Sequence, residues 1–138
     1  MNLFDIEAAY IARLQAAAPA GVIIVDSFDP TDWTADDAPK VGMHVTLDGL
    51  SKSDQVRTAA LMQLQFSAHT YLDTRRASPE DKAAAQACVL AALRAAVGFE
   101  WRTGLTATVT DAQGTGFDGR LSRITISFTV PAPVAGIA

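Results

Sequence analysis

Two histidines are the side chains best suited to proton transfer or metal binding in this chain. His44 and His69 each lie in a segment where apolar and polar residues alternate, the pattern of a half-buried β-strand. The two strands are expected to pair, which could bring the imidazoles together on the polar face. Two imidazoles without a nearby carboxylate or thiol make a weak metal site and an incomplete general base. We therefore interpret both as surface or interface hydrogen-bonding residues.

Two loops resemble ligand-binding loops without meeting their requirements. Residues 26–37 hold five aspartates but lack the central glycine and closing glutamate of a calcium-binding EF-hand loop. Residues 111–119 are rich in glycine, yet they contain no lysine and do not open a helix, as a phosphate-binding loop would. We predict a solvated or acidic contact loop in the first case and a flexible hairpin tip in the second. No metal and no cofactor are expected.

The single cysteine also argues against catalysis. Cys88 lies in an alanine-rich helical stretch without a histidine nearby in the sequence, so we interpret it as a small buried apolar residue. No disulfide can form within the chain. Because no group of residues has the pattern of a catalytic site, we expect the protein not to be an enzyme.

Length and composition indicate a folded protein and exclude several partners. A chain of 138 residues with 49% apolar and 19% charged residues fits one domain, residues 1–138, and argues against disorder. The net charge of −4 and the single adjacent basic pair, Arg75 and Arg76, give no electrostatic reason to expect nucleic acid. No segment reaches the roughly 18 to 20 apolar residues that cross a membrane, and no signal peptide is apparent, so a cytoplasmic protein is the default.

The elements that must position these residues follow from periodicity. Residues 3–18 and 79–97 are predicted helices, the second with a cap at Ser78 and an end at Gly98. Strands are predicted at residues 22–25, 40–48, 55–71, 105–110 and 120–130, with a turn at 50–54 and Pro131 ending the last strand. The predicted order is α-β-β-β-α-β-β. It indicates an α+β fold, with an antiparallel or mixed sheet of about four to five strands and two helices packed on one face.

This element order, together with the first helix Ile6–Leu14 (IEAAYIARL), resembles the tail-terminator and tail-completion proteins of long-tailed bacteriophages, in particular a small family of Mu-like phages and prophages. The resemblance spans nearly the whole chain. It implies a structural, non-catalytic virion protein of the tail–neck region, assembled in the host cytoplasm. Such proteins form a ring, commonly hexameric, on the last ring of the tail tube, stop its growth and offer a surface for head joining. The implied partners are copies of the chain, the tail tube and head-completion proteins.

A ring needs two different contact patches on each subunit. The acidic loop and the glycine-rich loop are the contacts that the resemblance suggests, while basic residues elsewhere and an uncharged polar sheet face could complement them. The expected interface residues are Asp29, Asp32, Trp33, Asp36, Asp37, Gln63, Gln65, Arg75, Arg76, Phe117 and Arg120.

Other functions stay open. The chain could be a different neck, connector or minor tail component, which differs only in its partner. It could also be a small α+β ligand-binding domain or enzyme with a pocket between helix and sheet. A pocket that enclosed His44, His69 and an acid would favour the enzyme.

Overall fold

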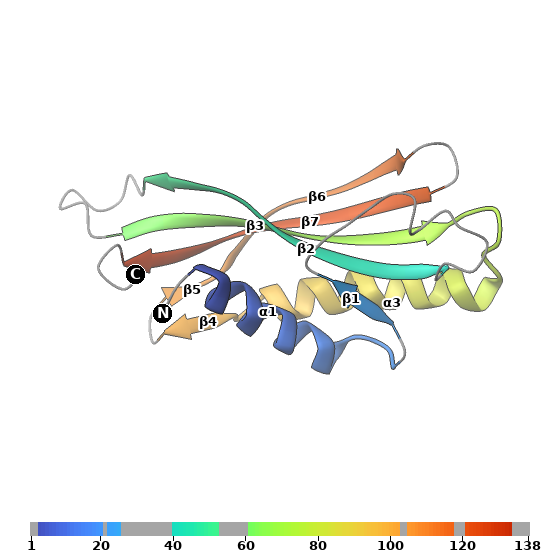
Figure 1. The fold of residues 1–138 in the computed structure, drawn as a ribbon, viewed down its shortest axis with the longest axis horizontal. Coiled ribbons are helices and arrows are strands. Elements are labelled where there is room, and N and C mark those ends of the chain that lie inside the picture. Colours follow the sequence, from blue (N-terminus) through green and yellow to red (C-terminus); the bar gives the residue numbers. More distant parts are fainter. Residues whose placement is uncertain are drawn as a thin grey trace.

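In the part of the chain that the structure describes, two helices cover one face of a long, twisted sheet, and neither lies on the other face (Figure 1). The computed structural model describes residues 3–20, 22–25, 40–52, 61–102, 105–117 and 121–133. The aspartate-rich stretch at residues 26–37 lies outside this part of the chain. Neither of the described helices is both long and apolar enough to cross a membrane.

The sheet has five strands in the order β1-β2-β3-β7-β6, and β3 is its centre. Strand β1 runs parallel to β2, and the other neighbours are antiparallel. Strands β4 and β5 form a separate two-stranded sheet, which was not predicted. The α+β class and the mixed sheet with two helices on one face are confirmed. The elements are α1 (Leu3–Ala17), β1 (Ile23–Val25), β2 (Val41–Lys52), β3 (Leu61–Asp73), α3 (Pro79–Ala96), β4 (Glu100–Arg102), β5 (Leu105–Thr106), β6 (Thr108–Phe117) and β7 (Leu121–Pro133).

Both ends of α3 form as predicted. The Ser78 hydroxyl accepts a hydrogen bond from the backbone N–H of Asp81, and the Asp81 carboxylate accepts one from the backbone N–H of Ser78, which completes a capping box. Gly98 follows the helix with φ of +76°, a left-handed conformation that glycine adopts at little cost. These two local signals fix where the helix starts and stops on the sheet.

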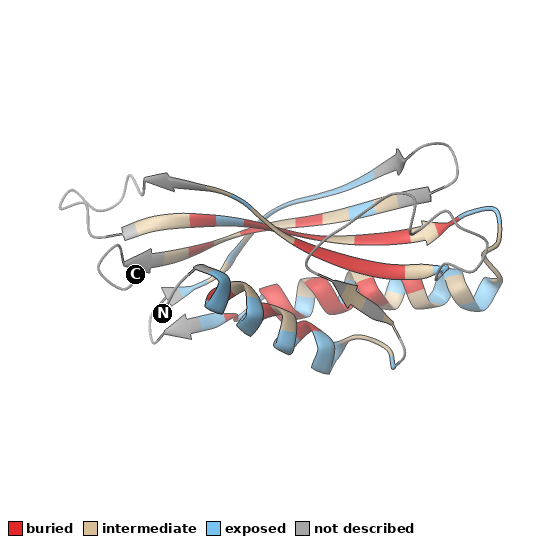
Figure 2. Cartoon of the chain, in the orientation of Figure 1, coloured by how far each residue is buried: buried red, intermediate tan, exposed pale blue. Residues whose placement is uncertain are grey.

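The core lies between the helices and one face of the sheet (Figure 2). Alternate residues of β2, β3 and β7 point toward the helices, and small side chains of α3 let that helix approach the strands closely. The buried set includes Ile6, Tyr10 and Leu14 of α1, Met43 and Val45 of β2, Leu64, Phe66 and Ala68 of β3, Ala91, Ala92 and Ala96 of α3, and Ile126, Phe128 and Val130 of β7.

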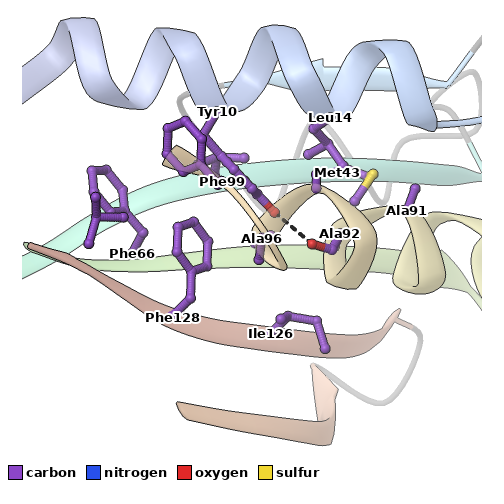
Figure 3. Packing of buried hydrophobic residues seen from close by; sticks show 14 of the residues in the cluster. Tyr10, Leu14, Met43, Phe66, Ala91, Ala92, Ala96, Phe99, Ile126 and Phe128 are labelled. Carbon is purple, nitrogen blue, oxygen red and sulfur yellow. Dashed lines mark hydrogen bonds between the residues drawn. The ribbon is translucent and has the colours of Figure 1, made fainter. Parts of the chain in front are cut away.

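Aromatic rings join the layers at the centre of this core (Figure 3). The ring of Phe128 lies 4.5 Å from that of Tyr10 and 5.6 Å from that of Phe66, measured between centroids. The buried Tyr10 hydroxyl donates to the backbone oxygen of Ala92 at 3.1 Å, so its polar end is satisfied inside the apolar layer. A single β7 side chain therefore contacts both α1 and the central strand.

A guanidinium group also links the two helices. Arg13 of α1 donates from Nε to the carbonyl of Ala95 at 2.8 Å and from Nη2 to the carbonyl of Val97 at 3.1 Å. The last carbonyls of a helix have no partner within it and carry partial negative charge, so a cation stabilises them. The side chain thus fixes the end of α3 against α1.

The predicted turn at residues 50–54 is wrong over Leu50–Lys52, which belong to β2. Leu50 is opposite Leu64, and Lys52 is opposite Met62. A bulge between Leu47 and Gly49 adds one residue and shifts the alternation. Leu50 therefore falls opposite the core residue Leu64, and pairing with β3 continues through residues whose types favour turns.

The predicted hairpin tip at residues 111–119 is also wrong where it is described. Strand β6 continues to Phe117 and pairs with β7, with Gly114 opposite Ile124. Glycine weakens a strand but does not prevent pairing when a neighbouring strand supplies the hydrogen bonds. Pro131 does not end β7, which pairs with β3 as far as Pro133. The last pair between β6 and β7 at this end is Thr108 with Thr129, so beyond Thr129 no described strand pairs with the other side of β7, and proline is tolerated at such an edge.

Replacing Phe128 by alanine is expected to lower the free energy of unfolding by about 3 to 5 kcal/mol, because the ring fills the space between α1 and β3. Ile124→Ala on the same strand is the matched control, with an expected loss of about 1 kcal/mol, since Ile124 is 38% exposed. Urea unfolding followed by circular dichroism measures both. Equal losses would contradict this description of the core.

Candidate assembly surface

The face of the sheet that points away from the helices carries polar, mostly uncharged side chains from three adjacent strands. The register sets His44 opposite His69, and Thr46 opposite Ser67, between β2 and β3. Across the next pair, Ser67 is opposite Ser127, His69 is opposite Thr125, and Gln65 is opposite Thr129. Hydroxyl, amide and imidazole groups thus form continuous rows across the sheet, which we call the polar face.

One hydrogen-bonded row runs through His69. The Thr46 hydroxyl donates its proton to Oδ1 of Asp48 at 2.7 Å. Its oxygen lies 3.2 Å from Nε2 of His69, and because its proton is already used, it accepts from Nε2–H. The Nδ1 of the neutral ring then accepts from the Thr125 hydroxyl at 2.8 Å. The row therefore passes from β7 through β3 to the carboxylate of Asp48 on β2.

A second row reaches the same carboxylate. The Ser67 hydroxyl donates to Oδ2 of Asp48. Since its proton is used there, Ser67 accepts from the Ser127 hydroxyl, whose oxygen lies 3.2 Å away. Asp48 is exposed and is the extra residue of the β2 bulge. Two rows of hydrogen bonds across three strands therefore end on one exposed carboxylate and hold it in place.

The expected approach of the two histidines is confirmed, because their ring centroids lie 5.7 Å apart. The expected lack of a nearby carboxylate is wrong, because Asp48 is linked to His69 through one threonine hydroxyl. Burial, followed by the charges of His44 and Arg123, lowers the pKa of His69 to about 4, although Asp48 acts in the opposite direction. A neutral His69 is suited to relaying hydrogen bonds. In the described part of the chain, no three histidine, cysteine, aspartate or glutamate residues are grouped to hold a metal.

A shallow hollow of about 360 Å³ lies beside Asp48 on this face. Besides Asp48, its lining consists of Gln65, Phe66, Thr110, Ser127, Phe128 and Thr129. Neither histidine lines it, so this hollow is not the pocket with two imidazoles and an acid that would favour an enzyme. Cys88 is buried among apolar residues, where burial raises the pKa of its thiol to about 11, as expected for an unreactive side chain.

Strand β6 forms one margin of the sheet, and within the described ranges no strand pairs with its outer side. Thr108 and residues 110–114 are exposed along it. A bulge next to Asp111 interrupts the edge, and the Asp111 carboxylate accepts the backbone N–H of Ala112 at 2.9 Å. Beyond these features the edge is open, and an open strand edge is a template for pairing with another chain.

The predicted interface residues have different environments. Gln63 and Gln65 lie on β3 at polar-face positions, and Gln65 is exposed. Arg75 is exposed in the turn after β3, whereas Arg76 forms an ion pair with the buried Asp73 at 2.7 Å. The backbone of Phe117 ends β6. The remaining six, Asp29, Asp32, Trp33, Asp36, Asp37 and Arg120, lie outside the described residues.

The sequence predicted the polar face, but it did not predict that two rows of hydrogen bonds meet at Asp48. The alternation placed Thr46 and Asp48 on the polar side of a strand, and nothing in it distinguished Asp48 from its neighbours. The convergence depends on the β2 bulge and on the register of three strands, which a single strand's pattern does not contain.

Comparison with known proteins extends these observations. No family model matches the chain, and no curated protein matches it. A chain in the virion of a native gene transfer agent particle has a similar structure, with a TM-score of 0.58, 20% sequence identity, and coverage of 92% of this chain and 93% of that chain. The resemblance to phage tail-terminator proteins is confirmed at the level of the fold.

A second similar structure is a sheath/tube terminator from an extracellular contractile injection system (PVC) in its extended state. The TM-score is 0.54 with 15% identity, and the match covers 97% of this chain. Our chain spans only 57% of the length of that terminator. At these identities the two comparisons establish a shared fold.

Stability is expected to fall as the pH is lowered from 6.5 to about 4. Over this range the unfolded chain binds a proton at His69 and the folded chain does not, so the free energy of unfolding decreases by up to about 3 kcal/mol. His69→Gln keeps a donor and an acceptor but does not titrate, so its loss over the same range should be smaller. Urea unfolding at a series of pH values measures the difference. Identical pH dependence in the two proteins would contradict a half-buried histidine that stays neutral in the folded protein.

Proposed function

We propose that this protein is a structural subunit of a phage-tail-like particle, where it forms a homo-oligomeric ring, hexameric in the manner of tail terminators, that caps the tail tube and provides the surface for joining the head. The observation that carries the proposal is the likeness of nearly the whole chain to a gene transfer agent virion chain and to a sheath/tube terminator. Neither of those proteins is described as an enzyme, and we propose a non-catalytic role here as well.

The surface supports this role on physical grounds. A ring requires a heterologous interface, in which two different patches of one subunit meet those of its neighbours. The polar face and the open edge of β6 are two such patches on one sheet. The polar face also has few charges for its size, so it can be covered by a neighbour without burying many unpaired ions.

A second position in the particle has some support. The gene transfer agent structure is described only as a virion, without a location for the similar chain. Another neck, connector or minor tail position is therefore the alternative. It would give the same fold and the same need for contacts between subunits, and it differs in where the copies lie.

Deleting the gene in a strain that produces the particles distinguishes these positions. Loss of a terminator should give tubes of variable, excessive length without heads, and expression of the intact chain from a plasmid should restore uniform tubes joined to heads. Electron microscopy of negatively stained particles measures the length distribution. Tubes of normal length that lack heads would indicate a connector, and normal particles would contradict both positions.

A further inference from the structure

We infer that the hollow beside Asp48 is a docking site for the Arg75 side chain of a second copy of this chain. The inference rests on the proposed function, since a structural ring requires contacts between copies. It assigns two specific residues to one heterologous contact.

The acceptor side of this contact is already organised. Each oxygen of the Asp48 carboxylate accepts one hydroxyl hydrogen bond, from Thr46 or from Ser67. A carboxylate has about four lone-pair positions, so two stay available for a new donor. Because both hydroxyl protons point at Asp48, the carboxylate does not have to reorganise when a cation arrives.

The lining of the hollow fits a guanidinium group. Gln65, Thr110, Ser127 and Thr129 bring amide and hydroxyl oxygens to the hollow beside the carboxylate. Phe66 and Phe128 also border it, but their rings are buried in the core on the other face of the sheet. A guanidinium is planar and presents several donors in a fork that matches a carboxylate, whereas an ammonium is a hydrated point charge. Among the described residues no cation forms an ion pair with Asp48.

The donor side is Arg75, in the turn between β3 and α3. The buried carboxylate of Asp73 accepts the backbone N–H groups of Arg75 and Arg76 at 3.1 Å and 3.3 Å and also pairs with the Arg76 side chain. The turn is therefore pinned, and Arg75 is exposed on it. Within the described part of the chain its guanidinium has no partner.

Other cations among the described residues fit the contact less well, and Arg123 already hydrogen-bonds the Tyr71 side chain. Arg13 bonds helix carbonyls, Arg76 pairs with Asp73, and Lys40 pairs with Asp81 at 3.7 Å. Lys82 and Arg94 are exposed on α3, in the helix layer that covers the opposite face of the sheet.

Asp48 and Arg75 cannot meet within one chain. Asp48 follows Leu47, which is opposite Phe66 on β3, and β3 continues for seven residues from there to Asp73. At roughly 3.3 Å per residue this is about 23 Å before the turn is reached. Figure 1 shows β2 and β3 running side by side along this length. Opposite charges on separate patches favour head-to-tail contact between copies.

Charge reversal of each residue tests the contact. In light-scattering and sedimentation measurements across a concentration series, the purified protein should self-associate. Asp48→Arg and Arg75→Asp should each raise the dissociation constant by about tenfold or more, and the double variant should restore it to within a few-fold. Asp48→Asn, which keeps the shape of the side chain, should weaken association and remove most of its salt dependence.

Glu80→Arg and Arg94→Asp are matched controls, because they make the same charge changes on exposed positions of α3. Both should associate like the unmodified protein, and thermal unfolding checks that every variant folds. A protein that stays monomeric, a double variant as weak as the single ones, or controls with equal effects would overturn the inference. Because the tube-length measurement is separate, a failure here leaves the proposed function standing.

Discussion

The rest of the structure depends on the separation of the two faces of β3. This central strand pairs with β2 on one side and β7 on the other. Its alternate residues Leu64, Phe66 and Ala68 enter the core, and Ser67 and His69 lie on the polar face. A shift of one residue in pairing would exchange the two faces. The apolar core and the hydrogen-bonded rows that end on Asp48 therefore stabilise the same register.

The two faces have different environments. On one face, α1 and α3 close the core, and contacts such as Tyr10 to Ala92 hold the helices together. Within the described ranges the other face carries no helix, and no strand pairs with the outer side of β6. A small protein with a stable covered face and an organised polar face is suited to assembly with other subunits. The same fold occurs in a chain of a gene transfer agent virion and in a sheath/tube terminator of a contractile injection system.

Local signals allowed much of the fold to be predicted. Alternation identified the core strands, and Ser78 and Gly98 marked the ends of α3, because each of these features acts within a few residues. Strand ends were missed at residues 50–52 and 111–117, where hydrogen bonds from a neighbouring strand outweigh composition. The candidate site was predictable only as a polar face. The two rows of hydrogen bonds that meet at Asp48 depend on tertiary contacts. The different environments of Arg75 and Arg76 depend on them as well.

The proposed role makes this chain a structural subunit at the end of a tail tube, in contact with copies of itself through the polar face or the β6 edge. Cryo-electron microscopy of the intact particle, reconstructed at the end of the tube, tests it most directly. We expect a ring of this fold on the last tube layer, with the polar face or the β6 edge buried against a neighbouring subunit. A particle without the chain, or copies whose polar face and β6 edge both face solvent, would contradict it.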